Sequence, residues 1–423
     1  MKILWVCNVV LPEFCNEFSI RAHPSGGWMS GFLNIISNID EFEIGFCFPI
    51  IDSWRHKDGI LGKFKYYSFS FSPEGSSFDE TLANRFKEVL INYNPDVIHI
   101  WGTEFPHSSA AYAACESLGL QRRVIIDIQG LIYYISKYHF NANLPCEYLN
   151  LKSGDYLTLS ETQNINIKRG LLELDLLKKA YNVFGRTEWD KECVRRINPD
   201  SVYYSCNRML RPMFYDYVGQ WSICNSQRYS IFTSQAHSTY KGLHYIFQAA
   251  PMIINIHPET HFYITGDDPT SHTTKGITPY GAYLSDLIKE LDLSEHITFL
   301  GRLDEKKIIE RFLKSHIFVS AASIENNCNS VTEAKLLGVP VVCSYVGGMF
   351  GRINHEEDGF LYQHDAPYMM ASYICRIFED DELASKFSEN AVKSTIPDTD
   401  RDTISMYIMA VYRTISGASI NHV

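Results

Sequence analysis

The amino-acid sequence predicts an α/β protein with two doubly wound parallel sheets in tandem. Short apolar and β-branched runs of strand type alternate along the chain with longer segments of helical period. The alternation loses its regularity between about 211 and 228 and then restarts. With 423 residues, the chain is long enough for two domains of ordinary size, each with its own core. Alternation of this kind is typical of parallel sheets covered by helices on both faces.

The composition indicates a folded protein and excludes several function classes. Hydrophobic residues make up 45% of the chain and charged residues 21%, a balance that disordered chains do not have. A formal net charge of -11 argues against a general nucleic-acid binder, whose affinity would come from clustered Lys and Arg. There is also no G-x-S-x-G elbow to support serine-hydrolase chemistry.

The cysteines and the apolar runs favour a cytoplasmic protein. The eleven cysteines are scattered, without a C-x-x-C pair or zinc-finger spacing, which favours reduced thiols. The first ten residues lack the length of a signal peptide core and are interpreted as a buried strand. Because no apolar run approaches ~20 residues, we expect membrane contact to be at most peripheral, at the inner face.

In the first half, the predicted strand at 1–10 is followed by a loop that ends in Gly26-Gly27, just before an apolar helix. Paired glycines there let the backbone approach a ligand closely, although a turn that needs positive φ explains them equally well. A further strand is predicted at 42–50, the segment 63–73 is predicted to be another strand or an extended loop, and an amphipathic helix is predicted at 78–96.

Polar side chains follow the next two strands of this half. His99 lies inside an apolar strand and is more typical of a core histidine than of a catalytic one, whereas Glu104 and His107 are predicted loop residues at the functional edge. Asp127, Gln129 and Gly130 stand at the end of the following strand. Residues 137–161 are rich in Tyr and Asn, which fits either a lid or an acceptor surface.

In the second half, predicted strands end near 235, at Gly266, at Gly301-Arg302 and at 323. Lys241-Gly242 opens the first helix, and this lysine is either a point charge for a diphosphate or a solvated surface residue. Residues 323–342 read as strand end, polar loop, helix and strand, with Glu325 in the loop and Glu333 in the helix. The free amides of that helix N-terminus favour an anion.

Carboxylate groups suggest two other kinds of site. Glu325 and Glu333 form either an acid/base pair or, more plausibly because they are well separated, two ligands for the hydroxyls of one extended molecule. The acidic run 398–402 resembles a metal site but precedes the final helix, where Asp is expected as a cap. Gly266-Asp267-Asp268 likewise fits a polar turn better than a metal site, so no metal site is predicted.

Three sequence features together resemble family-4 glycosyltransferases, the retaining enzymes of glycosyl transferases group 1 with the GT-B fold. They are Gly26-Gly27, Lys241-Gly242 and the pattern S-x-E-N-x-x-x-S-x-x-E-A-x-x-x-G-V-P-V-V from Ser323 to Val342. The resemblance implies two Rossmann-like domains that face each other across a cleft. We expect an acceptor-side domain at 1–215, a nucleotide-sugar domain at 216–400, and a last helix at 401–423 that crosses back to the first domain.

The resemblance also implies roles for individual residues. Lys241 would face the donor diphosphate and Glu325 the transferred sugar, which makes them the expected catalytic residues. Glu333 would bind the ribose, and the expected donor contacts as a whole are Glu333, Gly26, Gly27, Asn329, Ser330, Arg302, Leu303, Gln129 and Gln235.

The chain departs from the family pattern at three places. Gln235 stands where the family commonly has an arginine, Gln129 where it has a histidine that contacts the donor sugar, and Asn326-Asn327-Cys328 where glycines often follow the first glutamate. Losing the arginine removes a charge-assisted contact of roughly 1.5–3 kcal/mol. The candidates to replace it are Arg21, Arg186, Arg211 and Arg302.

The resemblance therefore implies metal-independent transfer of a hexose, with retention, from a UDP- or GDP-linked sugar to a hydroxyl of a sugar, glycan or lipid-linked acceptor. Polysaccharide or glycoconjugate assembly is the expected setting, and no further cofactor is expected. Two alternatives remain open. One is a sugar-nucleotide epimerase or a phosphorylase of the same fold, and the other is a non-catalytic sugar-nucleotide-binding protein.

Overall fold

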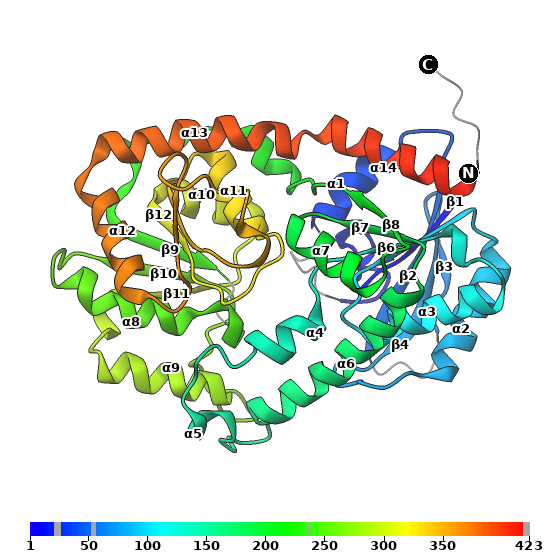
Figure 1. Ribbon diagram of the computed structural model, residues 1–423, viewed down its shortest axis with the longest axis horizontal. Coiled ribbons are helices and arrows are strands. Elements are labelled where there is room, and N and C mark those ends of the chain that lie inside the picture. Colours follow the sequence, from blue (N-terminus) through cyan, green and yellow to red (C-terminus); the bar gives the residue numbers. More distant parts are fainter. Residues whose placement is uncertain (21–26, 52–55, 235–236, 418–423) are drawn as a thin grey trace. The chain divides into compact units, whose positions relative to one another are not determined.

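The computed structural model describes residues 1–20, 27–51, 56–234 and 237–417, and these residues form two compact units (Figure 1). Unit 1 holds the described residues of 1–136, 164–212 and 399–423, and unit 2 holds those of 137–163 and 213–398. Each unit has its own mainly parallel sheet, which confirms the predicted class of two parallel-sheet α/β domains.

Within the described residues, unit 1 has a sheet of eight strands in the order β3-β4-β2-β1-β5-β6-β7-β8. Only the edge strand β3 is antiparallel to its neighbour. The strands are β1 (Lys2–Val6), β2 (Glu43–Ile51), β3 (Gly59–Leu61), β4 (Phe64–Phe71), β5 (Val97–Trp101), β6 (Val124–Asp127), β7 (Asn182–Gly185) and β8 (Val202–Ser205). The helices are α1 (Gly27–Ile36), α2 (Glu80–Tyr93), α3 (Pro106–Ser117), α4 (Ile132–Tyr134), α6 (Leu159–Lys179), which begins in unit 2, α7 (Glu188–Ile197) and α14 (Arg401–Ser416).

Alternate residues of the central strands of unit 1 bury their side chains on opposite faces of the sheet. Leu4, Ile98 and Ile126 belong to a core shared with α2, α3 and α6. Trp5 and Ile125 belong to a second core, shared with α1 and α14. Because both faces are covered, the strands read as continuous apolar runs, and this explains why they were predicted from sequence.

Unit 2 has a sheet with six parallel strands among its described residues, in the order β11-β10-β9-β12-β13-β14. They are β9 (Gln227–Ser234), β10 (His261–Thr265), β11 (Ile297–Gly301), β12 (Ser315–Ser320), β13 (Val341–Ser344) and β14 (Phe360–Tyr362). The helices are α5 (Cys146–Leu149), α8 (Leu243–Ile254), α9 (Pro279–Glu290), α10 (Glu305–Lys314), α11 (Asn329–Leu337), α12 (Pro367–Glu379) and α13 (Asp381–Thr399).

Two chain segments belong to a different unit from the residues next to them in the sequence. Residues 137–163, which the sequence prediction counted in the first domain, pack within unit 2, where Tyr148 donates to Asp286 at 2.8 Å and Ser153 to the carbonyl of Ile277 at 2.6 Å. The last helix, α14, packs within unit 1, where Arg413 pairs with Glu41 at 2.7 Å. Contacts with residues distant in sequence, which for α14 include the second core of unit 1, therefore decide both assignments.

In the part of the chain that the structure describes, no helix has both the length and the apolar character to cross a membrane. All eleven cysteines lie in this part, and none of them forms a disulfide.

Candidate active site

Loops that follow neighbouring strands of unit 2 meet where the strand order reverses. β9 lies between β10 and β12. From the carboxyl end of β9 the chain continues to β10 on one side, whereas from the carboxyl end of β12 it continues to β13 on the other side. In open parallel sheets, ligands bind at such a reversal. Lys241 follows β9 and Glu325 follows β12, which places both predicted catalytic residues at this point.

Gly242 fixes the position of Lys241. The short 3-10 turn Thr239–Lys241 ends at Gly242, whose φ of 74° is left-handed. A Cβ at Gly242 would overlap the carbonyl oxygen of Ala321, just after β12. The amide of Ser323 also donates to the carbonyl of Tyr240 at 2.8 Å. Glycine is thus needed at position 242 for the two loops to pack this closely.

Lys241 and Glu325 form a largely buried ion pair. The ammonium Nζ lies 2.5 Å from Oε1 of Glu325, and the two side chains are 18% and 10% exposed. Burial lowers the pKa of Lys241, but Glu325 and its neighbours outweigh this and raise the pKa well above its ordinary value. Burial and then the Glu325 charge raise the pKa of the nearby Cys328 to about 12, so its thiol is neutral. Lys241 therefore keeps its charge because Glu325 is beside it.

Helix α11 begins four residues after Glu325. Cys328 is its N-cap but provides no side-chain cap, and Asn329 and Ser330 form the first turn. The hydroxyl of Ser330 accepts from Ser234, at the end of β9, at 3.0 Å. Glu333 lies about a turn further along the helix and is 5% exposed. The sequence prediction of this local structure is confirmed, and the first-turn amides stand next to the loop that carries Glu325.

A third loop, after β13, supports Glu325 from the other side. The amide of Gly348 donates to the carbonyl of Glu325 at 2.8 Å. Gly347 has a φ of 49°, and a Cβ there would overlap the same carbonyl. The backbone of Glu325 is held in place by this glycine pair.

Arg302 and Leu303 follow β11 at the same edge. Arg302 makes two hydrogen bonds with Asp267, at 2.7 and 2.5 Å, although both side chains are exposed. Hydrogen bonding to Asp267 raises the pKa of Arg302. Leu303 is half-buried. Asp267 is thus the partner of an arginine, and Asp268 accepts from the amide of Thr270 at 2.8 Å in a local turn.

The acidic run before the last helix acts mainly as a cap. Asp400 is the N-cap of α14 and accepts from the amide of Thr403 at 2.9 Å, so the capping prediction is confirmed. Asp398 pairs with Arg352 at 3.1 Å. Among the residues described by the structure, no group of three or more His, Cys, Asp or Glu side chains is arranged to hold a metal ion.

Other predicted site residues lie elsewhere. Gly26, Gln235 and Arg21 are outside the described residues, and Gly27 is the first residue of α1. Gln129 is half-buried and follows β6, in unit 1.

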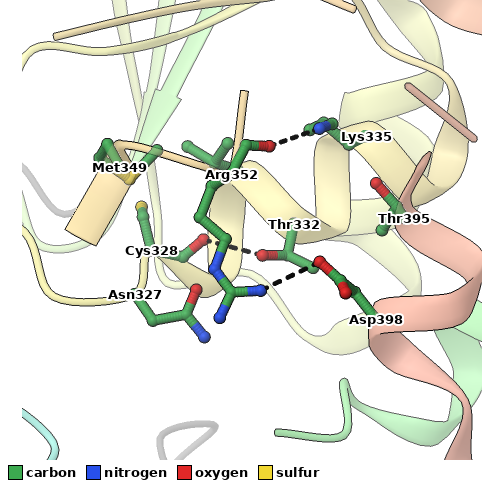
Figure 2. A pocket seen from close by; sticks show the side chains of 9 residues that line it. Asn327, Cys328, Thr332, Lys335, Met349, Arg352, Thr395 and Asp398 are labelled. Atoms are coloured by element: carbon green, nitrogen blue, oxygen red, sulfur yellow. Dashed lines mark hydrogen bonds and ion pairs between the residues drawn. The ribbon is translucent and has the colours of Figure 1, made fainter. Parts of the chain in front are cut away.

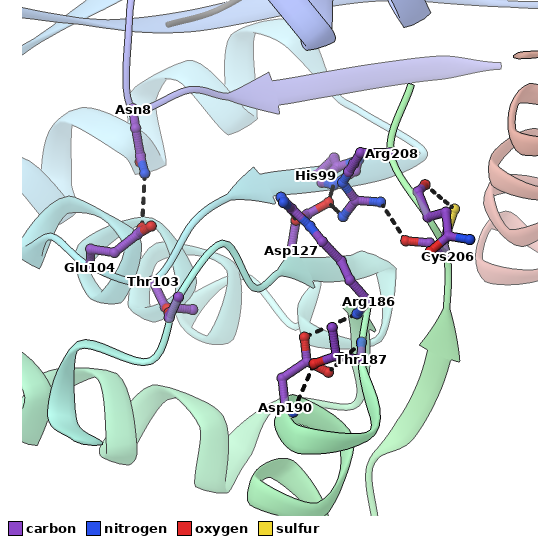
Figure 3. Close-up of polar contacts among 12 residues, drawn as sticks. Asn8, His99, Thr103, Glu104, Asp127, Arg186, Thr187, Asp190, Cys206 and Arg208 are labelled. Atoms are coloured by element: carbon purple, nitrogen blue, oxygen red, sulfur yellow. Dashed lines mark hydrogen bonds and ion pairs between the residues drawn. The ribbon is translucent and has the colours of Figure 1, made fainter. Parts of the chain in front are cut away.

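Unit 1 has a buried charged cluster at the carboxyl ends of its strands (Figure 3). Asp127, which is fully buried, pairs directly with Arg208 and lies 3.7 Å from Arg186. Burial lowers the pKa of His99 far below its ordinary value, so this side chain is neutral, and its Nδ1 contacts the hydroxyl of Tyr412 at 2.6 Å. His99 is therefore a core residue, as predicted, and Arg186 is engaged within unit 1.

Glu104 and His107 lie beside this cluster. Asn8 donates to Glu104 at 3.0 Å, and its carbonyl oxygen lies 2.8 Å from Nε2 of His107. The prediction that His107 is a loop residue is wrong, because it is the second residue of α3 and is 2% exposed. Burial lowers its pKa to about 3. Burial also raises the pKa of Glu104, and it raises that of the nearby Glu173 to about 8.

Sequence reasoning missed a pocket in unit 2 beside α11 (Figure 2). Its volume of about 10 Å³ has room for about one water molecule, and it is lined by Asn327, Cys328, Val331, Thr332, Lys335, Met349, Arg352, Thr395 and Asp398. Its cation Arg352 comes four residues after the glycine pair of the third loop, and that position is the one signal the sequence offered.

Comparisons with known proteins were consistent with this geometry. Residues 222–394 match the family described as Glycosyl transferases group 1. N-acetyl-alpha-D-glucosaminyl L-malate synthase from Bacillus anthracis is 21% identical over 331 residues, which cover 78% of this chain and 76% of that protein.

Two solved structures resemble the whole chain. Sucrose-phosphate synthase from Thermosynechococcus elongatus has a TM-score of 0.72 and 15% identity, covering 99% of this chain and 100% of the other. HepE from Anabaena in complex with UDP-glucose has a TM-score of 0.66 and 15% identity, covering 98% and 100%. These likenesses show the fold.

Proposed function

We propose that this chain is a glycosyltransferase that transfers a hexose, with retention, from a nucleoside-diphosphate sugar to an acceptor hydroxyl, since residues 222–394 match the family described as Glycosyl transferases group 1. The observation that carries the proposal is the Lys241–Glu325 pair at the sheet reversal of unit 2, next to the N-terminus of α11. This arrangement offers a cation and helix amides to an anion, and a carboxylate to a sugar hydroxyl.

The chemistry we infer needs charge stabilisation above all. The bond between the anomeric carbon and the diphosphate oxygen breaks, and its electron pair stays on the leaving diphosphate. Lys241 and the first-turn amides of α11 would stabilise that growing negative charge without a metal. Glu325 would accept from a hydroxyl of the transferred sugar, and the buried Glu333 from the ribose. We propose a UDP-linked donor first, because HepE, of the same fold, was solved with UDP-glucose.

The acceptor class and the setting are part of the proposal. We propose a hydroxyl of a sugar, glycan or lipid-linked acceptor, as the family resemblance implies, in polysaccharide or glycoconjugate assembly. The free cysteines support work in the cytoplasm, with peripheral membrane contact where the acceptor is lipid-linked.

A donor and acceptor screen tests the proposal. The intact chain is incubated with UDP-glucose, UDP-galactose, UDP-N-acetylglucosamine and GDP-mannose, each with and without simple glycosides, and nucleotide release is measured. We expect release with one donor, and NMR of the product should show the anomeric configuration of that donor. Inversion would refute the retaining mechanism. Isomerised donor without acceptor would favour the epimerase, and binding without transfer or hydrolysis would favour a sugar-nucleotide-binding protein.

A further inference from the structure

The sheet of unit 1 also reverses its strand order, and Glu104 lies at that reversal. β1 lies between β2 and β5. From the carboxyl end of β1 the chain continues to β2 on one side, whereas from the carboxyl end of β5 it continues to β6 on the other side. Asn8 follows β1 and Glu104 follows β5, and Nδ2 of Asn8 donates to Oε2 of Glu104 at 3.0 Å (Figure 3). Since ligands bind at such reversals in open parallel sheets, this pair stands where a ligand of unit 1 is expected.

Gly102 makes room for the pair. Its φ is 100°, and a Cβ at this position would overlap both Nδ2 of Asn8 and Oε2 of Glu104. The amide of Gly102 donates to the carbonyl of Asp127 at 2.9 Å, and its carbonyl accepts from the hydroxyl of Ser108 at 2.8 Å, so its backbone is held from two directions. Glycine is therefore required at position 102 for Asn8 and Glu104 to meet.

The environment of Glu104 favours its charged form. Burial raises the pKa of Glu104, but hydrogen bonds from its own amide, from Asn8 and from the amide of Thr103 act in the opposite direction, as does the charge of Arg186. Burial also raises the pKa of the neighbouring Glu173, to about 8, so that side chain is protonated at neutral pH. Of these two carboxyl groups, Glu104 therefore carries the negative charge.

His107 fixes the orientation of Asn8. Because a carboxylate only accepts hydrogen bonds, Asn8 must present Nδ2 to Glu104 and its carbonyl oxygen to Nε2 of His107, 2.8 Å away. His107 must then carry its proton on Nε2, and its Nδ1 has no partner among the described residues. Burial lowers the pKa of His107 to about 3, so the ring is neutral. A buried histidine thus orients Asn8 and, through it, the carboxylate.

Glu104 can accept further hydrogen bonds from a ligand. It is half-buried, and within the described residues Asn8 is the one side chain that donates to it. An ionised carboxylate has about four acceptor positions, so those that remain suit the adjacent hydroxyls of a sugar ring.

The charges around Glu104 favour an uncharged ligand. Burial has the largest effect on the pKa of both Glu104 and Arg186, but each of the two charges also shifts the pKa of the other. A phosphate at this place would be repelled by Glu104, and an ammonium group would be repelled by Arg186. A hydroxyl group has neither conflict.

We propose that Glu104 determines acceptor specificity, by accepting hydrogen bonds from the hydroxyls of an uncharged sugar, with Asn8 as its positioning residue. This inference rests on the proposed function, because it names the class of acceptor. It concerns only unit 1, in the part of the chain for which the sequence predicts an acceptor-side role.

Acceptor kinetics with the intact chain test this inference. The methyl glycosides of glucose, galactose, mannose and N-acetylglucosamine are compared with glucose 6-phosphate and glucosamine, using the nucleotide sugar that supports transfer. We expect a methyl glycoside to be the best acceptor, and Glu104→Gln to raise its KM about tenfold while the donor KM stays the same. The glutamine keeps an oxygen that can accept from Asn8, so this variant should melt like the wild type.

Two further variants separate a positioning role from a general loss of structure. Asn8→Ala should raise the acceptor KM and leave the donor KM unchanged, because it removes the group that orients Glu104. Glu116→Gln is the matched control, since Glu116 is on the exposed side of α3 and pairs with Lys179 at 3.4 Å; it should keep the wild-type acceptor KM.

Binding of the same methyl glycosides without nucleotide, followed by saturation-transfer difference NMR, separates this inference from the proposed function. A glycoside that binds the wild type, binds Glu104→Gln about tenfold more weakly and is never glycosylated would contradict the proposed function alone. Transfer with the same acceptor KM in the wild type, Glu104→Gln and Asn8→Ala would overturn the inference alone. It would also be overturned if the wild type preferred glucose 6-phosphate or glucosamine, or if it neither bound nor glycosylated any of the four methyl glycosides.

Discussion

Replacing Glu325 by Gln should destabilise the protein by leaving Lys241 as a buried charge without its partner. At an N–O separation of 2.5 Å, the attraction is about 7 kcal/mol for an effective dielectric constant of about 20. Much of it offsets the desolvation of the two groups, so removing one partner of such a pair costs about 3–5 kcal/mol. Since Lys241 is 18% exposed, we expect about 3 kcal/mol.

A double-mutant cycle separates the pair from other effects. Urea unfolding near neutral pH is measured for the wild type, Glu325→Gln, Lys241→Met and the double variant. We expect each single variant to lose about 3 kcal/mol and the double variant to lose no more than either, because it leaves no unpaired charge. Losses that add to within about 0.5 kcal/mol would refute the reasoning.

The pH dependence of this coupling follows from the raised pKa of Lys241. A folded-state lysine pKa above the unfolded value means that the stabilisation is complete below about pH 10.4 and is lost as the pH rises through the folded value. The coupling measured in the cycle should therefore be constant from pH 6 to about pH 10. A coupling that disappears within that range would show that Lys241 is not held charged by Glu325.

Four further outcomes are expected. Glu333→Ala should weaken UDP-sugar binding about tenfold, measured by calorimetry, because a hydrogen bond is lost, and it should change kcat less. An unchanged affinity would show that Glu333 does not bind the ribose. Glu325→Ala should lower kcat more than it lowers UDP affinity, and equal losses would argue for a role in nucleotide binding only. EDTA should leave activity largely intact, whereas loss restored by Mg²⁺ would favour a metal at 398–402. Finally, burial raises the pKa of Glu173 to about 8, so the folded state holds a proton that the unfolded state releases near pH 4.3. Stability should therefore fall as the pH rises from about 5 to 8, and Glu173→Gln should flatten that slope in thermal melts.

Much of the site could be predicted because its signals are local. Gly242 is needed where the backbone is left-handed and a neighbouring carbonyl lies close, and Glu325 and Glu333 belong to one strand-loop-helix unit. The fold was predictable for a similar reason, since strands buried on both faces leave long apolar runs.

Features that depend on contacts between distant segments were not predictable. The pairing of Arg352 with Asp398, 46 residues later, is visible only once α13 is packed beside the loop after β13. The same holds for residues 137–163, whose place in unit 2 depends on contacts such as that between Tyr148 and Asp286. Burial of Glu173 and His107 likewise results from helix packing, which a polar residue in a weakly periodic segment does not reveal.

The balance of charge at the proposed site bears on how it could work with glutamine at position 235. Arg302 is paired with Asp267, whereas Lys241 and the amides of α11 would be donors for the proposed diphosphate. Because Lys241 is already paired with Glu325, a diphosphate bound there would have to compete with that carboxylate. In the proposed reaction, a complete donor would compensate for the competition, because its sugar hydroxyl would give Glu325 a new partner when the lysine turns to the diphosphate. The product nucleotide would have no such hydroxyl. Under this proposal, the same carboxylate would keep the lysine charged before the donor binds and would favour release of the nucleotide after transfer.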